Sequence, residues 1–209
     1  MKHILCYGDS NTYGFIPFGG RYDENTRWTC LLAKHLGKDY RIIDEGLNGR
    51  TVCQDDPFDR FRNGLTYLIP CLQSHLPVDL TILMLGSNDL KQYFNPSVEK
   101  ISDGLYRLGQ IAKEMTLAPV LLVSPILLEK ESAVIGPTFS AESIAISRGL
   151  APALREQAER LGISFMDAAK YAKASPRDGL HLPPEGHRAL ADAFYQKIQE
   201  ILSGQGRQE

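Results

Sequence analysis

A serine near one end of the chain and an Asp–His pair near the other have the residue types of a nucleophile and its base. Ser10 comes just after the apolar run 3–7 and a glycine. An apolar run that stops at a glycine indicates a buried strand entering a tight turn. Asp178 precedes His181 by three residues in a Gly/Pro-rich stretch, so one turn can bring the carboxylate to the imidazole and stabilise its protonated form. This pattern predicts nucleophilic catalysis, with His181 taking the proton of Ser10.

Two other predicted strand ends carry candidate hydrogen-bond donors for a developing negative charge. Asn88 follows the apolar run 79–85, and loss of one such donor typically costs about 10²–10³ in rate. Gly49 lies in a glycine loop after the run 40–44, where the backbone N–H of a glycine can approach a ligand closely. Gly46 lies in the same loop, so the residues leave open which glycine donates.

Taken in order, these blocks resemble those of the SGNH (GDSL-type) hydrolases. The blocks are Gly8-Asp9-Ser10, the glycine at 49, Gly86-x-Asn88-Asp89 and Asp178-x-x-His181. Together they span the whole chain, and the stretches 23–37, 45–57 and 75–94 are similar to the bacterial arylesterase/acyltransferase branch. The family usually has leucine after the serine, where this chain has Asn11.

The resemblance implies a catalytic triad and an oxyanion hole. The triad is Ser10, Asp178 and His181, and the oxyanion hole comprises the Ser10 N–H, the Gly49 N–H and the Asn88 side chain. The implied activity is hydrolysis of short acyl esters, acetyl above all, such as aryl esters or acetylated carbohydrates. It proceeds through an acyl-serine intermediate, with acyl transfer to alcohols as a further activity. The resemblance implies no cofactor, and it implies a homo-oligomer.

Three alternatives remain at this point. A thioesterase or lysophospholipase would share the fold and the triad. A flavodoxin-like binding domain would use the first glycine loop without catalysis, although Gly8 and Gly14 do not form the G-x-G-x-x-G pattern. A metal-dependent phosphoesterase would gather His181 and His187 with nearby carboxylates.

The composition of the chain excludes several classes of partner and location. The chain has 209 residues and a formal net charge of −2, which gives no reason to expect nucleic acid or an anionic membrane as partner. No apolar run reaches the roughly 20 residues that span a bilayer, and none forms a signal-peptide core. The four cysteines lack C-x-x-C spacing, so the sequence predicts reduced thiols, no metal site and a cytoplasmic location.

Alternating strand-like and helix-like segments predict the architecture. Strands are expected at 3–7, 40–44, 79–85, 119–124 and 163–167, and helices near 26–36, 63–75, 97–116, 140–161 and 185–202. The pattern favours an α/β fold with a five-stranded parallel sheet in a three-layer, flavodoxin-like α/β/α arrangement. We expect one domain over 1–209 with a frayed tail at 203–209. Pro70 is expected to kink or split its helix.

Two long loops, 8–25 and 125–139, are expected to wall an apolar acyl pocket and to pack between subunits. The side chains predicted to bind substrate are Asn11, Tyr13, Trp28, Phe94 and Ile126.

Overall fold

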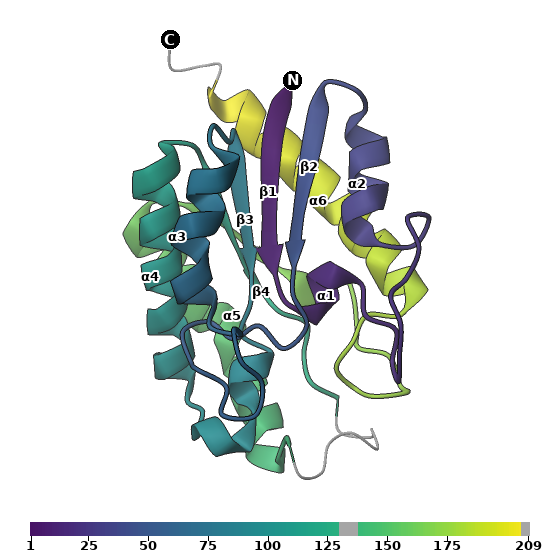
Figure 1. The fold of residues 1–209 in the computed structure, drawn as a ribbon, viewed down its shortest axis with the longest axis vertical. Coiled ribbons are helices and arrows are strands. Elements are labelled where there is room, and N and C mark those ends of the chain that lie inside the picture. The colour runs from purple at the N-terminus through teal and green to yellow at the C-terminus, as the bar shows by residue number, and fades with distance from the viewer. Residues whose placement is uncertain (130–137, 206–209) are drawn as a thin grey trace.

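Five strands form one parallel sheet in the computed structural model, which describes residues 1–129 and 138–205. The strands are β1 (Lys2–Gly8), β2 (Tyr40–Gly46), β3 (Leu80–Met84), β4 (Val120–Ser124) and β5 (Ser164–Asp167). Their order is β2-β1-β3-β4-β5, and Figure 1 labels the first four strands of this order. The strand order reverses direction at β1, and ligands bind outside the carboxyl ends of strands at such a switch point. All five predicted strands and the parallel sheet are confirmed.

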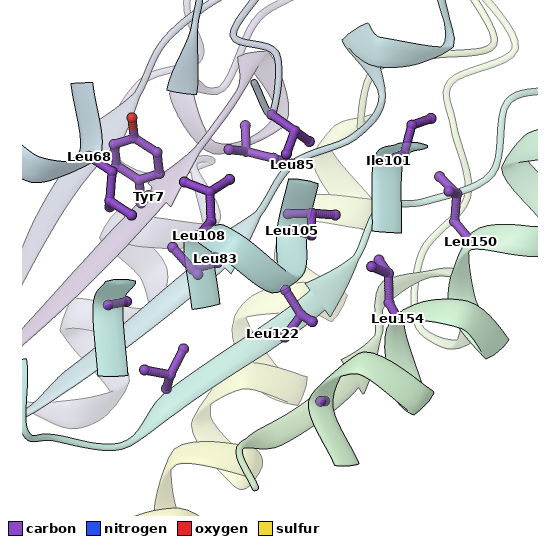
Figure 2. Packing of buried hydrophobic residues seen from close by; sticks show 14 of the residues in the cluster. Tyr7, Leu68, Leu83, Leu85, Ile101, Leu105, Leu108, Leu122, Leu150 and Leu154 are labelled. Atoms are coloured by element: carbon purple, nitrogen blue, oxygen red, sulfur yellow. The ribbon is translucent and has the colours of Figure 1, made fainter. Parts of the chain in front are cut away.

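Helices cover both faces of the sheet, as predicted. On one face lie α3 (Gly64–His75), α4 (Val98–Thr116) and α5 (Ala141–Leu161), and on the other lie α2 (Trp28–Leu36) and α6 (Pro184–Gln205) (Figure 1). The central strands β1, β3 and β4 are apolar in almost continuous runs because both of their faces are buried. Leu5 and Tyr7 of β1 pack toward α3 and α4, whereas Ile4 and Cys6 pack toward α2 and α6. Figure 2 shows the first of these two core clusters, around Leu105.

Short helices occupy segments that we predicted as loops or turns. A one-turn helix, α1 (Ser10–Tyr13), begins the predicted loop 8–25. Two 3₁₀ helices, η1 (Asn88–Leu90) and η2 (Gln92–Phe94), follow β3, and η3 (Ala168–Lys170) follows β5. These turns hold polar side chains just beyond the carboxyl ends of β1 and β3.

Two predicted helix features differ from the structure. Helix α3 runs through Pro70 without being split, so of the two predicted effects, a kink or a split, only the split is excluded. Proline removes one intrahelical hydrogen bond, but Leu68 and Leu72 on either side are fully buried and hold the helix to the sheet. Helix α6 continues to Gln205, past its predicted end at 202. The rest of the predicted tail, 206–209, and part of the loop 125–139 lie outside the described residues.

No helix within residues 1–129 and 138–205 is long and apolar enough to cross a bilayer. All four cysteines are free thiols.

Candidate active site

The turn after β1 places Ser10 at the carboxyl edge of the sheet. Ser10 is the first residue of α1, and Asp9 caps this helix by accepting a hydrogen bond from the Asn11 N–H at 2.9 Å. The chain turns this sharply because residue 8 is glycine, where an added Cβ would lie only 2.0 Å from Thr12 Oγ1. Ser10 is 6% exposed and lines a small cavity at the surface.

The structure brings Ser10, His181 and Asp178 together, although the first two lie 171 positions apart in the chain. Ser10 Oγ is 2.9 Å from His181 Nε2, and His181 Nδ1 is 2.6 Å from Asp178 Oδ2. The second distance is short, as expected for a hydrogen bond to a charged group. This order of contacts lets His181 accept a proton from Ser10 while Asp178 stabilises the imidazolium.

A tight turn holds the Asp178 carboxylate in place. Its second oxygen, Oδ1, accepts hydrogen bonds from the backbone N–H groups of Leu180 and His181, at 3.1 and 3.0 Å. Burial opposes ionisation of this carboxyl, but the hydrogen bonds from His181 outweigh burial and hold the pKa of Asp178 below its ordinary value. Asp178 is therefore ionised at neutral pH, as an imidazolium partner requires.

Three hydrogen-bond donors lie around the opening beside Ser10. Asn88 Nδ2 donates to the Arg50 carbonyl oxygen at 3.1 Å, which fixes the side chain and leaves its second amide hydrogen for the cavity that Asn88 lines. The N–H groups of Ser10 and Gly49 donate to no other residue in the described parts of the chain. Both residues line the same cavity, so their N–H groups and the Asn88 amide group are available to stabilise a developing oxyanion there.

Gly46, the other candidate glycine, has a different position. Its N–H donates to Asp44 Oδ1 at 3.3 Å, and an added Cβ would lie 2.2 Å from the backbone nitrogen of Tyr13. Gly46 thus allows β2 to pack against α1, whereas Gly49, with φ of +76°, faces the cavity.

Asp89 ties the Asn88 turn to the loop that follows Gly49. Both oxygens of its carboxylate accept from the Val52 N–H, at 3.0 and 2.9 Å. Burial raises the pKa of Asp89 to about 7, against the opposing effect of these hydrogen bonds. Asp9 contributes a smaller raising effect.

The cavity beside Ser10 has a volume of about 180 Å³. One of the aromatic residues that line it is Phe15, whose ring centroid is 4.7 Å from that of His181. Its lining residues are Ser10, Phe15, Asn48, Gly49, Asn88, Lys91, Phe139, Leu180 and His181. Phe15 and Phe139 belong to the two long loops expected to wall a pocket, but neither they nor Asn48, Lys91 and Leu180 were predicted individually as site residues. Each lies within five positions of a predicted site residue except Phe139, which ends the second long loop.

The side chains predicted to bind substrate do not line this cavity. Trp28 is fully buried, its Nε1 donates to the Asn11 carbonyl oxygen at 3.0 Å, and its ring packs 4.4 Å from that of Phe194. Ile126 is buried in the core between the sheet and α6. The prediction that these two residues form the pocket is wrong, because helix packing takes both side chains into the interior.

The other three predicted pocket residues also face elsewhere. The ring of Tyr13 lies 4.3 Å from the Arg21 guanidinium, and Phe94 packs against Tyr93 at 4.6 Å. Asn11 is 3% exposed and is hydrogen-bonded to the segment that carries His181.

The two hydrogen bonds of Asn11 lie on either side of His181. Asn11 Nδ2 donates to the Leu180 carbonyl oxygen at 3.2 Å, and Asn11 Oδ1 accepts from the Leu182 N–H at 2.8 Å. The residue after the nucleophile is thereby bonded to both neighbours of the base. Asn11 thus links the two halves of the site and does not line the cavity beside Ser10.

His187 does not join His181 in a ligand cluster anywhere in the described chain. It is fully buried, and its Nδ1 lies 3.4 Å from the Trp28 N–H. Burial lowers the pKa of His187 to about 4, with Arg27 and His181 adding to this effect. A neutral, enclosed imidazole that joins α6 to α2 gives no support to the phosphoesterase alternative.

A family model describes nearly the whole chain. The GDSL-like lipase/acylhydrolase family matches residues 6–189, which include every residue of the triad and of the donor set. A comparison with curated protein sequences gives no match.

Solved structures of esterases are similar over almost their full length. An aryl esterase from M. smegmatis is 33% identical, with 96% of this chain and 100% of that chain covered and a TM-score of 0.91. Est24, a carbohydrate acetylesterase from Sinorhizobium meliloti, is 34% identical over 96% and 100% of the two chains, with a TM-score of 0.90. A putative arylesterase from Agrobacterium tumefaciens is 36% identical, with the same coverage and a TM-score of 0.87.

The strand-end site, the family match over residues 6–189 and these structural neighbours agree, and the chain belongs to the GDSL-like lipase/acylhydrolase family as a carboxylic ester hydrolase.

Proposed function

We propose that the protein is a serine esterase for short acyl esters, with acetyl esters preferred. The observation that carries this proposal is the hydrogen-bonded chain Ser10–His181–Asp178 opening on a cavity of about 180 Å³. The side chains of Phe15, Phe139 and Leu180 wall the cavity, so a short acyl group meets an apolar surface there. A long acyl chain would have to leave this small space, which disfavours the lysophospholipase alternative.

In the proposed mechanism, His181 accepts the hydroxyl proton as Ser10 Oγ attacks the ester carbonyl carbon. The oxyanion that forms accepts hydrogen bonds from the Ser10 N–H, the Gly49 N–H and the Asn88 amide group. His181 then donates the proton to the leaving alcohol or phenol, and an acyl group remains on Ser10. Water, activated by His181, hydrolyses this intermediate, and an alcohol in the same place would complete acyl transfer.

Polar groups at the cavity favour a leaving group that carries hydroxyl groups. Asn48 lines the cavity, and its buried Oδ1 has no hydrogen-bond partner among the described residues. A buried acceptor without a partner costs about 1–3 kcal/mol, so rotation of the Asn48 side chain to accept from a sugar hydroxyl in the cavity would be favoured. Structural neighbours include both an aryl esterase and a carbohydrate acetylesterase, and this contact supports acetylated carbohydrates as substrates.

Turnover of p-nitrophenyl acetate and octanoate by wild type and Ser10→Ala tests the proposal, with intact-mass detection of the acylated protein. We expect acetate to be preferred, an acyl adduct on the wild type, and neither turnover nor adduct with Ser10→Ala. Equal turnover by both proteins would refute the role of Ser10. Preference for octanoate, or for acyl thioesters, would instead favour the lysophospholipase or thioesterase alternative. The homo-oligomer and the cytoplasmic location stay predictions.

A further inference from the structure

A second group of reactive side chains lies between β2 and α3, apart from the triad. Glu45 is the penultimate residue of β2, and Cys71 and His75 lie one turn apart on α3. A carboxylate oxygen, a thiol sulfur and an imidazole nitrogen from these residues all lie within 4.8 Å of one another. Glu45 Oε1 and His75 Nε2 are 2.9 Å apart.

We propose that Glu45, Cys71 and His75 bind a divalent transition-metal ion of the zinc type. One sulfur, one nitrogen and one oxygen ligand form a donor set that Zn²⁺ accepts, with bond lengths of about 2.0–2.3 Å. In a tetrahedral site such bonds place neighbouring ligand atoms about 3.3–3.6 Å apart. The three atoms need move by only about 1 Å to meet this geometry.

The fold supplies a fixed frame and an entry path for the ion. Residues i and i+4 of a helix face the same side, so Cys71 and His75 both point toward β2. Cys71 is buried at 1% exposure, whereas the side chains of His75 and Glu45 are 30% and 20% exposed. Glu45 also lines a separate cavity of about 810 Å³, and the partial exposure of His75 and Glu45 gives an ion and its fourth ligand, a water molecule, access to the cluster.

Arg50 leaves the Glu45 carboxylate available. The Arg50 guanidinium lies 4.1 Å from the ring centroid of Tyr7 and 5.3 Å from that of Tyr67. It donates hydrogen bonds to the backbone carbonyl oxygens of Gly8 and Glu45, and it makes no ion pair with a carboxylate of the described residues.

The thiol must lose its proton when the ion binds. Burial, with the Glu45 charge adding to it, raises the pKa of Cys71 to about 12, and Arg50 opposes this shift. A coordinated thiol is deprotonated outright because the metal charge replaces the proton. Binding therefore releases the Cys71 proton to solvent and forms one metal–sulfur bond.

Titration of the full-length, chelator-stripped protein with Co²⁺ and Zn²⁺ tests the proposal. Co²⁺ bound to a thiolate gives a sulfur-to-metal charge-transfer absorption band, and Zn²⁺ should displace the Co²⁺ at one ion per chain. We expect Cys71→Ser to lose the band. We expect His75→Gln to keep it while weakening affinity on the order of 10- to 100-fold or more.

Cys30→Ser is the matched control, because Cys30 lies on α2 at the opposite face of the sheet. It should bind Co²⁺ like the wild type. Absence of the band in wild type, or an unchanged band in Cys71→Ser, would overturn the proposal. His75 is partly exposed, so we expect His75→Gln to fold even if Cys71→Ser does not. An unchanged affinity of His75→Gln for Co²⁺ would also refute the site. Ions bound at His181 give no thiolate band, so the readout is specific to the cluster.

Discussion

Replacement of Asn11 by alanine tests whether this side chain holds the nucleophile and the base together. The change removes the donor to the Leu180 carbonyl oxygen and the acceptor for the Leu182 N–H. The Asn11 backbone is unaffected, so the hydrogen bond from Trp28 Nε1 to its carbonyl oxygen stays. Only the bridge between the Ser10 turn and the His181 segment is lost.

The expected cost follows from two buried backbone groups that lose their partner. Each unsatisfied buried group costs about 1–3 kcal/mol, and partial relaxation makes a loss of about 2–4 kcal/mol in the free energy of unfolding reasonable. For a chain of this size that corresponds to a fall in Tm of about 5–15 °C. His181 also becomes less constrained, and a misplacement of about 1 Å can cost on the order of 10² in rate.

We therefore expect Asn11→Ala to lower kcat for p-nitrophenyl acetate by about 10- to 100-fold and to leave KM nearly unchanged. KM is spared because Asn11 does not line the cavity. Asn11→Leu, which fills the volume without restoring the hydrogen bonds, should show a similar loss of kcat. If Asn11→Leu recovered full activity, packing alone would explain the role of this residue.

Asn63→Ala is the control for a purely structural loss. Asn63 caps α3 by accepting from the Thr66 N–H at 3.2 Å, and it donates to the Cys53 carbonyl oxygen. It does not contact the Ser10–His181 pair. This variant should lower Tm without lowering kcat. If Asn11→Ala behaved in the same way, the reasoning that links the bridge to catalysis would be refuted.

Four further variants test the donor set, the leaving-group contact and two buried titratable groups. Asn88→Ala should lower kcat by about 10²–10³ with little change in KM, and steady-state kinetics would contradict the proposed donor if KM alone rose. Asn48→Ala should raise KM for an acetylated sugar but not for p-nitrophenyl acetate; equal effects on both substrates would exclude a contact to the sugar. Asp89 has a raised pKa of about 7, so its contribution to stability is present at low pH and is lost as pH rises through 7. Asp89→Asn should therefore gain Tm relative to wild type between pH 5 and 8, and a constant difference would argue against a buried charge. His187 has a pKa lowered to about 4, so the free energy of unfolding of the wild type should fall by about 3 kcal/mol as the pH falls from 6.5 to 4. In His187→Asn the free energy of unfolding should change less with pH over this range.

The sequence by itself determined the sheet and the chemically active residues. Ser10, Asn88 and Gly49 each follow an apolar run that forms a parallel strand, and the carboxyl ends of neighbouring strands meet at one edge. Asp178 and His181 are three residues apart, so a local turn brings them into contact. These features depend on short stretches of chain, so the pattern of residues along the sequence is enough to predict them.

Only the tertiary structure decided which other side chains surround these residues. Asn11 bonds to residues 169 and 171 positions away, a contact that no local pattern contains. Trp28 was expected in the pocket, but packing of α2 against α6 takes its ring into the core. The cysteine spacing predicted no metal site, yet β2 brings Glu45 beside Cys71 and His75 of α3. Contacts of this kind depend on how helices and strands pack in three dimensions, and spacing along the chain does not encode them.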